Sequence, residues 1–223
     1  MNSHSQKTNK RHQENTKLTL HTEETYRAFP VMSKNGPLIK EALERLYSTI
    51  NLALNEYPRI FAIRIDLRIP VIMGDQYDSR MISRFIDSMK TKIAHDRQKA
   101  MKHRPYAHDS SLRYFWTKEY SEDGRPHYHV LLLLNRDAYH TLGQFRHGAR
   151  NMYSRIQEAW MSALGLVGEG REMYVHFSEN GQYHVNRMDL AAFAELFYRA
   201  SYLCKAKSKH YGDRSHSYGS SRH

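Results

Sequence analysis

The sequence predicts an α+β domain built on a ferredoxin- or RRM-like split βαβ antiparallel sheet, with helices on one face and the other face open for a site. From residue 61 onward, segments with an apolar period of two and segments with an apolar period of 3.6 alternate. Their order is strand, helix, strand, strand, helix, strand hairpin, helix. The 223 residues suffice for one such domain with its own core. In this topology the third strand lies between the first and the second.

The two ends of the chain have the composition of tails. Residues 1–30 are polar and charged without periodicity, which predicts a flexible basic segment. Residues 211–223 are basic and rich in Gly and Ser, which predicts a second one. The folded domain is therefore expected over residues 31–210, beginning with a helix over 37–57 that starts at Pro37.

The first half of the sheet unit is predicted as a strand followed by a helix. Residues 61–69 alternate, so the polar side of this strand carries Arg64, Asp66 and Arg68. Residues 81–93 form an apolar stripe at helical spacing, and the polar side of this helix is rich in Lys and Arg.

Two further strands are expected over residues 112–120 and 127–134, joined by a short polar loop with a glycine at 124. A helix is predicted over 145–164. After it, the Asn-Gly pair at 180–181 is the strongest hairpin-turn signal in the chain, and it predicts two short strands on either side.

Composition points to the kind of partner. The chain has 34 Lys and Arg against 23 Asp and Glu, a formal charge of +11, and 12% aromatic residues that include 16 Tyr. Cations mixed with flat rings suit phosphates and stacked bases. Ordinary basic globular proteins share this composition, so it does not establish nucleic-acid binding by itself.

Several function classes are excluded. Cys204 is the single cysteine, so the chain cannot form an intrachain disulfide, a Cys-only zinc site or a redox pair. No Gly-rich loop of the nucleotide-hydrolase kind occurs, which argues against an ATP-driven motor. The N-terminal segment lacks the apolar core of a signal peptide, and the longest aliphatic run, 130–134, is too short to span a membrane. We therefore expect a cytoplasmic protein with no membrane partner.

A histidine pair is the first candidate site. His127 and His129 lie on one face of the predicted central strand, where both imidazoles can reach one metal ion. A three-residue hairpin loop over 122–124 places Glu119 opposite His127 and completes a set of two His and one carboxylate. Asp66 is a reserve ligand.

Two alternatives stay open for this pair. A two-residue Asp-Gly turn would place Lys118 and Tyr120 beside the histidines instead of a carboxylate. With 15 His in the chain, about one His-x-His occurs by chance, so both histidines could also be ordinary surface residues.

The last predicted helix, over 189–207, supplies a second candidate site. At 100° per residue, Tyr198, Tyr202, Lys205 and Lys209 form one polar stripe opposite an apolar face. Two tyrosines one turn apart can act as alternate nucleophiles on phosphorus, and a lysine beside them offsets the phenolate charge. The simpler alternative is that this stripe only contacts nucleic acid.

Together these motifs carry a family resemblance. The GRPHYHVLL segment at 124–132 resembles the His-hydrophobic-His motif of the HUH endonuclease superfamily, and YRASYLCK at 198–205 resembles its two-tyrosine motif with a following lysine. Order and spacing are similar to those of rolling-circle replication initiators, above all the replication proteins of inoviruses and cryptic prophages of the YagK/YfjJ type. The resemblance covers about residues 35–223. The first strand, IRIDL at 63–67, departs from the Thr-Leu-Thr-like first motif of many members.

The resemblance implies a specific activity. His127, His129 and Glu119 would hold Mg²⁺ or Mn²⁺ against a scissile phosphate, and Tyr202 or Tyr198 would attack it and form a 5′-phosphotyrosine. Partners would be single-stranded or supercoiled origin DNA and a host helicase, polymerase and single-strand-binding protein. The candidate DNA contacts are Arg64, Arg68, Arg113, Arg125 and Lys209. The alternatives are a noncatalytic single-stranded nucleic-acid binder, such as a prophage regulator, and a transposase or relaxase of the same superfamily.

Overall fold

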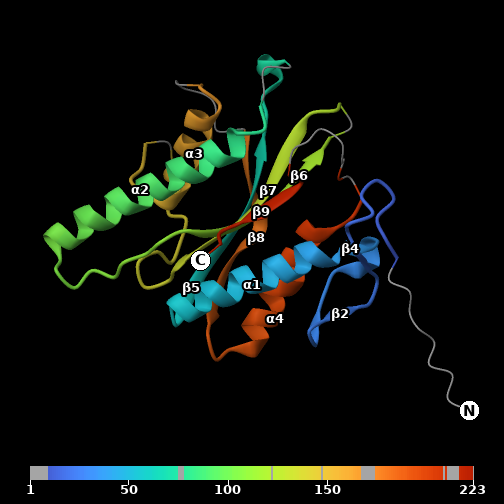
Figure 1. Ribbon diagram of the computed structural model, residues 1–223. Coiled ribbons are helices and arrows are strands. Elements are labelled where there is room, and N and C mark those ends of the chain that lie inside the picture. The colour runs from blue at the N-terminus through green and yellow to red at the C-terminus, as the bar shows by residue number, and fades with distance from the viewer. Residues whose placement is uncertain are drawn as a thin grey trace, which may run out of the picture.

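The computed structural model describes residues 10–74, 78–121, 123–146, 148–166, 174–207, 209 and 216–222. These residues form a mixed α+β structure in which helices lie on both sides of a five-stranded antiparallel sheet (Figure 1). The α-helices are α1 (Lys40–Glu56), α2 (Met81–His103), α3 (Met152–Ala163) and α4 (Leu190–Ser201). The strands of the large sheet are β5 (Arg59–Arg68), β6 (Arg113–Tyr120), β7 (Pro126–Asn135), β8 (Val175–Asn186) and β9 (Tyr218–Ser220).

The strand order is β8-β5-β7-β6-β9, and every neighbouring pair is antiparallel. The prediction that the third strand lies between the first and second is confirmed, since β7 pairs with β5 on one side and β6 on the other. This register sets Asp66 of β5 beside His129, and Glu119 of β6 beside His127.

Two apolar cores lie on opposite faces of the sheet. One joins the sheet to α2 and α3 and includes Phe61 and Val130, and the other joins it to α1 and α4 and includes Ile60 and Leu131. The expectation of helices on one face only is therefore wrong. Consecutive residues of β5 and β7 are both apolar over much of their length, so both faces of the sheet need a cover.

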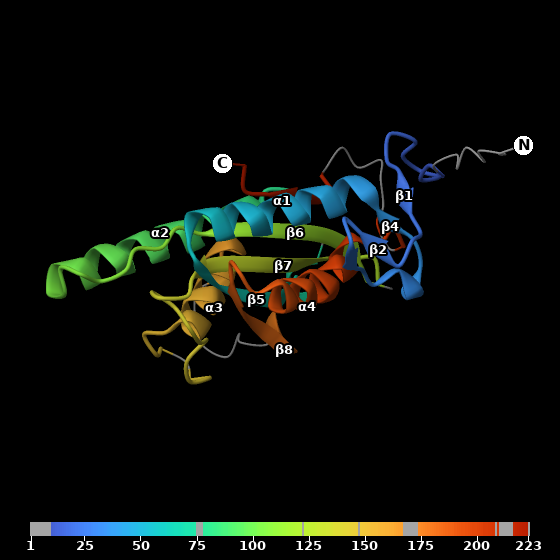
Figure 2. The ribbon, with the colours of Figure 1, turned by 90° about the horizontal axis from the view of Figure 1, so that it is seen from below.

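Part of the predicted N-terminal tail is folded. Residues 18–39 contain four two-residue strands, and Leu18, Tyr26 and Val31 are buried in the α1/α4 core. The strands are β1 (Leu20–His21), β2 (Thr25–Tyr26), β3 (Phe29–Pro30) and β4 (Leu38–Ile39). Figure 2 places them beside the N-terminal end of α1, away from α2. Isolated apolar residues without a helical or strand period do not predict a folded segment from the sequence. Here these three residues are nevertheless buried, because they pack in the core beside α1. Residues 1–9 lie outside the described residues.

The predicted C-terminal tail also contains a strand. β9 pairs with β6, and the flanking bonds from Lys118 N to the Ser217 carbonyl and from Ser221 N to the Tyr114 carbonyl extend the pairing. Three residues among Gly and Ser are too short a run to carry a strand period, which is why the sequence indicated a tail. Residues 211–215 lie outside the described residues.

The predicted hairpin at the Asn-Gly pair 180–181 is wrong. Both of its flanks pair with β5 as one strand, β8, and residues 178–181 bulge out opposite Arg64. Asn180 has a φ of 53°, and a side chain on Gly181 would lie 2.7 Å from the Ser178 carbonyl oxygen. A residue pair that permits a tight turn also permits a bulge, and here pairing with β5 on both sides decides the outcome.

The predicted last helix is shorter than expected. α4 ends at Ser201 and continues as the 3₁₀ turn η4 (Tyr202–Cys204), after which Lys205 forms a single β-bridge with Leu38. Lys205 and Lys209 therefore do not continue the helical stripe. The helix predicted over 145–164 starts later, at Met152, and the one over 37–57 starts at Lys40. Within the described part of the chain, no helix combines the length and apolarity that crossing a membrane requires.

Candidate metal and tyrosine site

The histidine pair lies on the α1/α4 face of the sheet, near the N-terminal end of β7. The hairpin before it has the three-residue loop, because Ser121 N donates to the Arg125 carbonyl at 3.0 Å and Gly124 has a φ of 75°. The alternative two-residue turn is therefore wrong. Glu119 stands opposite His127 as that register requires.

Glu119, His127 and His129 form a cluster of metal-ligating type. One ligand atom from each lies within 4.8 Å of the other two. The Glu119 Oε2 atom is 3.3 Å from His129 Nε2 and 3.9 Å from His127 Nε2, and the two rings meet edge to face. This is a mixed nitrogen and oxygen donor set converging on one point.

Asp66 positions one of these histidines. Its Oδ1 atom is 2.6 Å from His129 Nδ1, which fixes the ring so that Nε2 faces Glu119. A carboxylate on the far nitrogen of a ligating histidine is a recurrent support of metal sites. The open choice between Glu119 and Asp66 is thus answered by geometry, since Glu119 belongs to the cluster and Asp66 holds His129 from behind.

The residues present fit a divalent cation. His129 Nε2 is buried and has no hydrogen-bond partner among the described residues, although a buried ring nitrogen normally has one. It faces the point on which the His127 and Glu119 ligand atoms converge. A cation at that point would satisfy the nitrogen.

Glu119 is ionised although it is 2% exposed. Lys205 Nζ lies 2.9 Å from Oε2, and Lys209 Nζ lies 3.2 Å from Oε1. Burial raises the pKa of Glu119, but the nearby His129 ring and the charge of Lys209 outweigh burial, so the pKa is well below its ordinary value. Burial lowers the pKa of Lys209, which is 3% exposed and is therefore part of the cluster instead of a free DNA contact.

Tyr202 joins this cluster through Lys205. The Lys205 ammonium donates to the Tyr202 hydroxyl at 2.8 Å and also pairs with Glu119. The Tyr202 ring is 6.2 Å from the His129 ring between centroids. Burial lowers the pKa of Lys205, but the bonds to Tyr202 and Glu119 raise it by more. The net pKa lies above its ordinary value, so the side chain stays charged.

Tyr198 is placed differently. It lies one turn before Tyr202 on α4 and is partly exposed. Among the described residues its hydroxyl forms no hydrogen bond, whereas that of Tyr202 is held by Lys205. The two tyrosines of the motif are therefore not equivalent in this structure.

An open cleft of about 710 Å³ leads to the two histidines. Its lining includes Arg68, Arg125 and Tyr174 together with His127 and His129. Arg125 is paired with Asp123 of the hairpin. Tyr174 was not singled out in the sequence because it precedes a strand whose course was predicted wrongly.

The other predicted DNA contacts have structural partners. Arg64 donates to Ser178 Oγ at 3.3 Å and to the Arg199 carbonyl at 3.5 Å, so it ties the β8 bulge to α4. Arg113 pairs with Glu56 of α1 at 2.7 Å. It is six residues from Glu119 along β6, or about 20 Å, so the structure does not bring it to the cluster.

Sequence reasoning missed His176. It pairs in register with Asp66, and its Nδ1 atom is 3.4 Å from Asp66 Oδ2. The strand period could have found it only with β8 aligned as one continuous strand.

Residues 21–221 match the family described as the YagK/YfjJ C-terminal domain. The chain belongs to the YagK/YfjJ family. Two relatives from Escherichia coli K12 agree with this match. The uncharacterized protein YfjJ is 32% identical over 203 residues, which are 85% of this chain and 98% of YfjJ. The uncharacterized protein YagK is 34% identical over 198 residues, which are 84% of this chain and 95% of YagK. No solved structure matches. The YagK/YfjJ match covers the histidine pair, both tyrosines and β9.

Proposed function

We propose that this YagK/YfjJ-family protein is a metal-dependent HUH endonuclease that nicks and joins single-stranded DNA through a phosphotyrosine, and that it starts and ends rolling-circle replication of a phage or prophage. One observation carries the proposal. The Tyr202 hydroxyl is linked through the Lys205 ammonium to Glu119, a member of the two-histidine cluster. A nucleophile, a cation and a metal-ligating set thus share one site.

We also infer that the sheet unit is the ferredoxin-like split βαβ fold. The support is the order β8-β5-β7-β6 together with the connections, since α2 lies between β5 and β6 in sequence and α3 lies between β7 and β8. In such a unit the site is expected on the face opposite the two crossover helices, and His129 lies on the face opposite α2 and α3.

The nicking step follows from the groups around Tyr202. Its Oη atom attacks the phosphorus, the bond from phosphorus to the 3′-oxygen breaks, and the strand leaves with a free 3′-hydroxyl while its 5′-phosphate stays on the tyrosine. The phenolic proton passes to water, and the departing 3′-oxygen takes a proton from water. Lys205 is placed to stabilise the negative charge that develops on the attacking oxygen, because its ammonium lies 2.8 Å from that oxygen.

A bound Mg²⁺ or Mn²⁺, held by His127, His129 and Glu119, would supply Lewis-acid neutralisation of the phosphate charge. Asp66 keeps the His129 ring oriented for that role. Arg68 and Arg125 on the cleft wall hold the phosphates on either side.

Tyr198 is assigned to the second strand transfer. After a host polymerase has extended the 3′-hydroxyl and regenerated the origin, Tyr198 cleaves the new junction, and the released 3′-hydroxyl attacks the first phosphotyrosine and closes a circle. Its partly exposed position one turn from Tyr202 suits a residue that acts once the first tyrosine is occupied. Unwinding is left to a host helicase and strand protection to a host single-strand-binding protein.

The test is a covalent-adduct assay. The purified chain is incubated with single-stranded DNA from around its own gene, with Mn²⁺, Mg²⁺ or EDTA, and protein-bound DNA is resolved on a denaturing gel. We expect a metal-dependent adduct that Tyr202→Phe abolishes and Tyr198→Phe retains. Tyr106→Phe is the matched control, because Tyr106 is 96% exposed on another part of the surface. An adduct at the normal rate in Tyr202→Phe would contradict the assignment.

One observation favours a second candidate, a noncatalytic single-stranded nucleic-acid binder. Lys205 and Lys209 both pair with Glu119, so side chains of the protein itself already balance the charge of this carboxylate. On that alternative the protein binds the same DNA tightly, forms no adduct with any metal, and loses nothing in Tyr202→Phe.

A further inference from the structure

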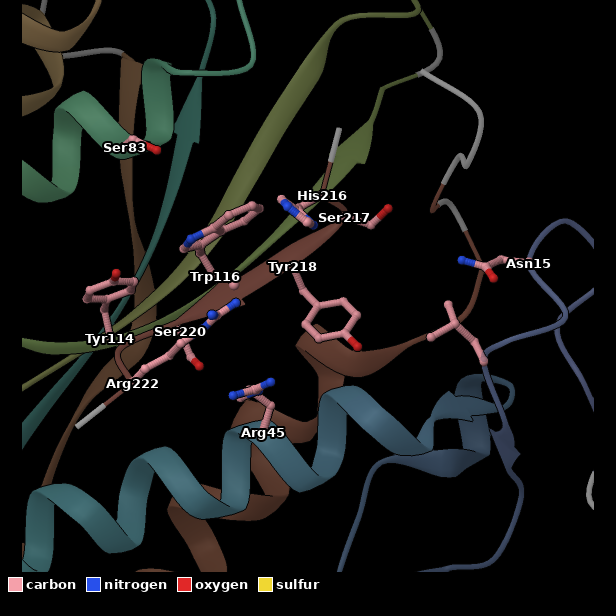
Figure 3. Close-up of a pocket in the computed structure, with 12 residues that line it drawn as sticks. Asn15, Arg45, Ser83, Tyr114, Trp116, His216, Ser217, Tyr218, Ser220 and Arg222 are labelled. Carbon is pink, nitrogen blue, oxygen red and sulfur yellow. The ribbon is translucent and has the colours of Figure 1, made fainter. Parts of the chain in front are cut away.

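A second cleft, of about 440 Å³, lies along the outer edge of β9 (Figure 3). It runs between α1, which contributes Arg45, and the start of α2, which contributes Ser83. None of its lining residues also lines the cleft at the histidine pair. The site proposed above therefore does not account for it.

Aromatic rings form the wall of this cleft. Tyr114 and Trp116 come from β6 and Tyr218 from β9, and all three are partly exposed (Figure 3). The indole of Trp116 is fixed in place, because the backbone of Gly219 lies against it so closely that a side chain there would come within 2.8 Å of the ring. Tyr128 meets the same indole edge to face at 6.0 Å. An aromatic platform held in this way binds a flat ligand with little loss of side-chain freedom.

The charged groups of this cleft are cationic. Arg45 and Arg222 are exposed in it, and among the described residues neither guanidinium pairs with a carboxylate. No Asp or Glu belongs to the lining as described. The nearby Glu41 is already engaged, since both its oxygens accept from Thr19 N, at 2.9 and 3.0 Å.

The edge of β9 adds backbone hydrogen-bonding groups. Gly219 pairs with Trp116, and the flanking bonds at Ser217 and Ser221 also point to β6. The backbone N–H and C=O groups of Tyr218 and Ser220 therefore point away from the sheet, as the alternation of an antiparallel ladder requires. They line the cleft beside the arginines.

We propose that this cleft is a second binding site for single-stranded nucleic acid, in which a base stacks on Trp116 or Tyr218 and the adjoining phosphates bind Arg45 and Arg222. Rings beside unpaired guanidinium groups are the combination that single strands use. A peptide strand added to β9 would use the same backbone groups but would leave both cations unmatched. This inference rests on the proposed function and deepens it, because it places the DNA segment that flanks the nick at the β9 edge of the sheet.

The fluorescence of Trp116 tests the proposal directly. The chain has 2 Trp, and the other one, Trp160, is 0% exposed. Titrating the full chain with a short oligothymidylate is expected to quench the tryptophan emission to a plateau, because stacked bases quench indole, and Trp116→Phe is expected to lose the quenching. The double variant Arg45→Glu/Arg222→Glu should weaken binding at least about tenfold.

The matched control has the same charge change elsewhere. Lys102→Glu/Arg104→Glu alters two exposed cations at the C-terminal end of α2 and should bind with the affinity of the unaltered chain. Absence of quenching, or equal affinity of the two double variants, would overturn the proposal. Tyr202→Phe should quench normally, because Tyr202 does not line this cleft. If the unaltered chain is quenched but forms no adduct with any metal ion, the nuclease proposal alone has failed.

Discussion

At the scale of single residues, the site depends on one hydrogen bond behind the histidine pair. Asp66 is not a member of the cluster, yet its 2.6 Å bond to His129 Nδ1 fixes which nitrogen is offered to Glu119. Asp66→Asn keeps the side-chain shape but removes the carboxylate that favours this orientation. We expect Mn²⁺ affinity to fall about 10- to 100-fold, measured by calorimetric titration.

Asp137→Asn is the control for that change, because Asp137 pairs with Arg59 at the opposite end of β5. Its Mn²⁺ affinity should equal that of the unaltered chain. If Asp66→Asn also binds Mn²⁺ unchanged, the supporting role of Asp66 is wrong.

Lys205 offers a second test at this scale. Its ammonium contacts both the Tyr202 hydroxyl and Glu119, so Lys205→Gln removes the positive charge beside the attacking oxygen. On the proposed mechanism the rate of adduct formation should fall about 100-fold, in the range seen when one electrostatic group is removed from an active site. Lys205→Arg should recover part of that rate in the same gel assay. A Gln variant as fast as the Arg variant would contradict the role of the charge.

At the scale of elements, the β8 bulge shapes the region between β5 and α4. Residues 178–181 leave the sheet opposite Arg64, whose guanidinium then bonds Ser178 and the Arg199 carbonyl. Gly181→Ala would set a methyl group 2.7 and 2.9 Å from two backbone oxygens. We expect a loss of roughly 1–3 kcal/mol in the free energy of unfolding, measured in urea. Glu179→Ala, at an exposed position of the same bulge, should lose less than about 0.5 kcal/mol.

The N-terminal strands give a pH prediction. Burial and the hydrogen bond that its hydroxyl donates to Glu44 raise the pKa of Tyr26 to about 12. The folded state thus favours the neutral phenol, while the unfolded chain ionises near pH 10. The resulting stabilisation is complete below about pH 10 and is lost as the pH rises towards 12. Urea unfolding across that interval should show a decline that Tyr26→Phe reduces, and equal declines in both proteins would contradict it.

At the scale of the whole molecule, the formal charge of +11 favours association with DNA, and the phosphate contacts at each site set the salt dependence of binding. Each phosphate contact on a single strand contributes about −0.7 to the slope of log affinity against log salt. Filter binding from low to physiological salt should therefore give a steep line, and Arg45→Glu/Arg222→Glu should flatten it by about 1.4. If the control Lys102→Glu/Arg104→Glu gives the same slope as Arg45→Glu/Arg222→Glu, the bound DNA does not reach β9.

The sequence predicted the central part of this molecule and missed its edges. Strong periodicity identified β5, α2, β6 and β7. The glycine at 124 favoured the register that brings Glu119 to His127, and the structure decided between that register and the two-residue turn. β9 and the N-terminal strands are too short to show a period, so only packing against β6 and α1 creates them. The end of α4 at Ser201 was also beyond reach, because the helical pattern continues past it.

The candidate site, like the fold, was predicted where local sequence patterns determine it and was missed where long-range pairing does. The spacing of the motifs was enough to predict its histidines and tyrosines. The burial of Lys209 against Glu119 and the contact of His176 with Asp66 depend on long-range strand pairing, which the sequence does not show. Arg113 was predicted from charge and strand face alone, which cannot tell the two ends of a strand apart.

The placement of β7 between two carboxylate-bearing neighbours has a consequence for folding. Asp66 comes from one flanking strand and Glu119 from the other, and each faces the histidines only in its native register. A slip of one residue in either strand would turn that carboxylate to the opposite face. On the proposed function, a cation would therefore bind the correctly paired sheet in preference to every shifted one. During refolding it would stabilise the native strand alignment over the shifted alignments.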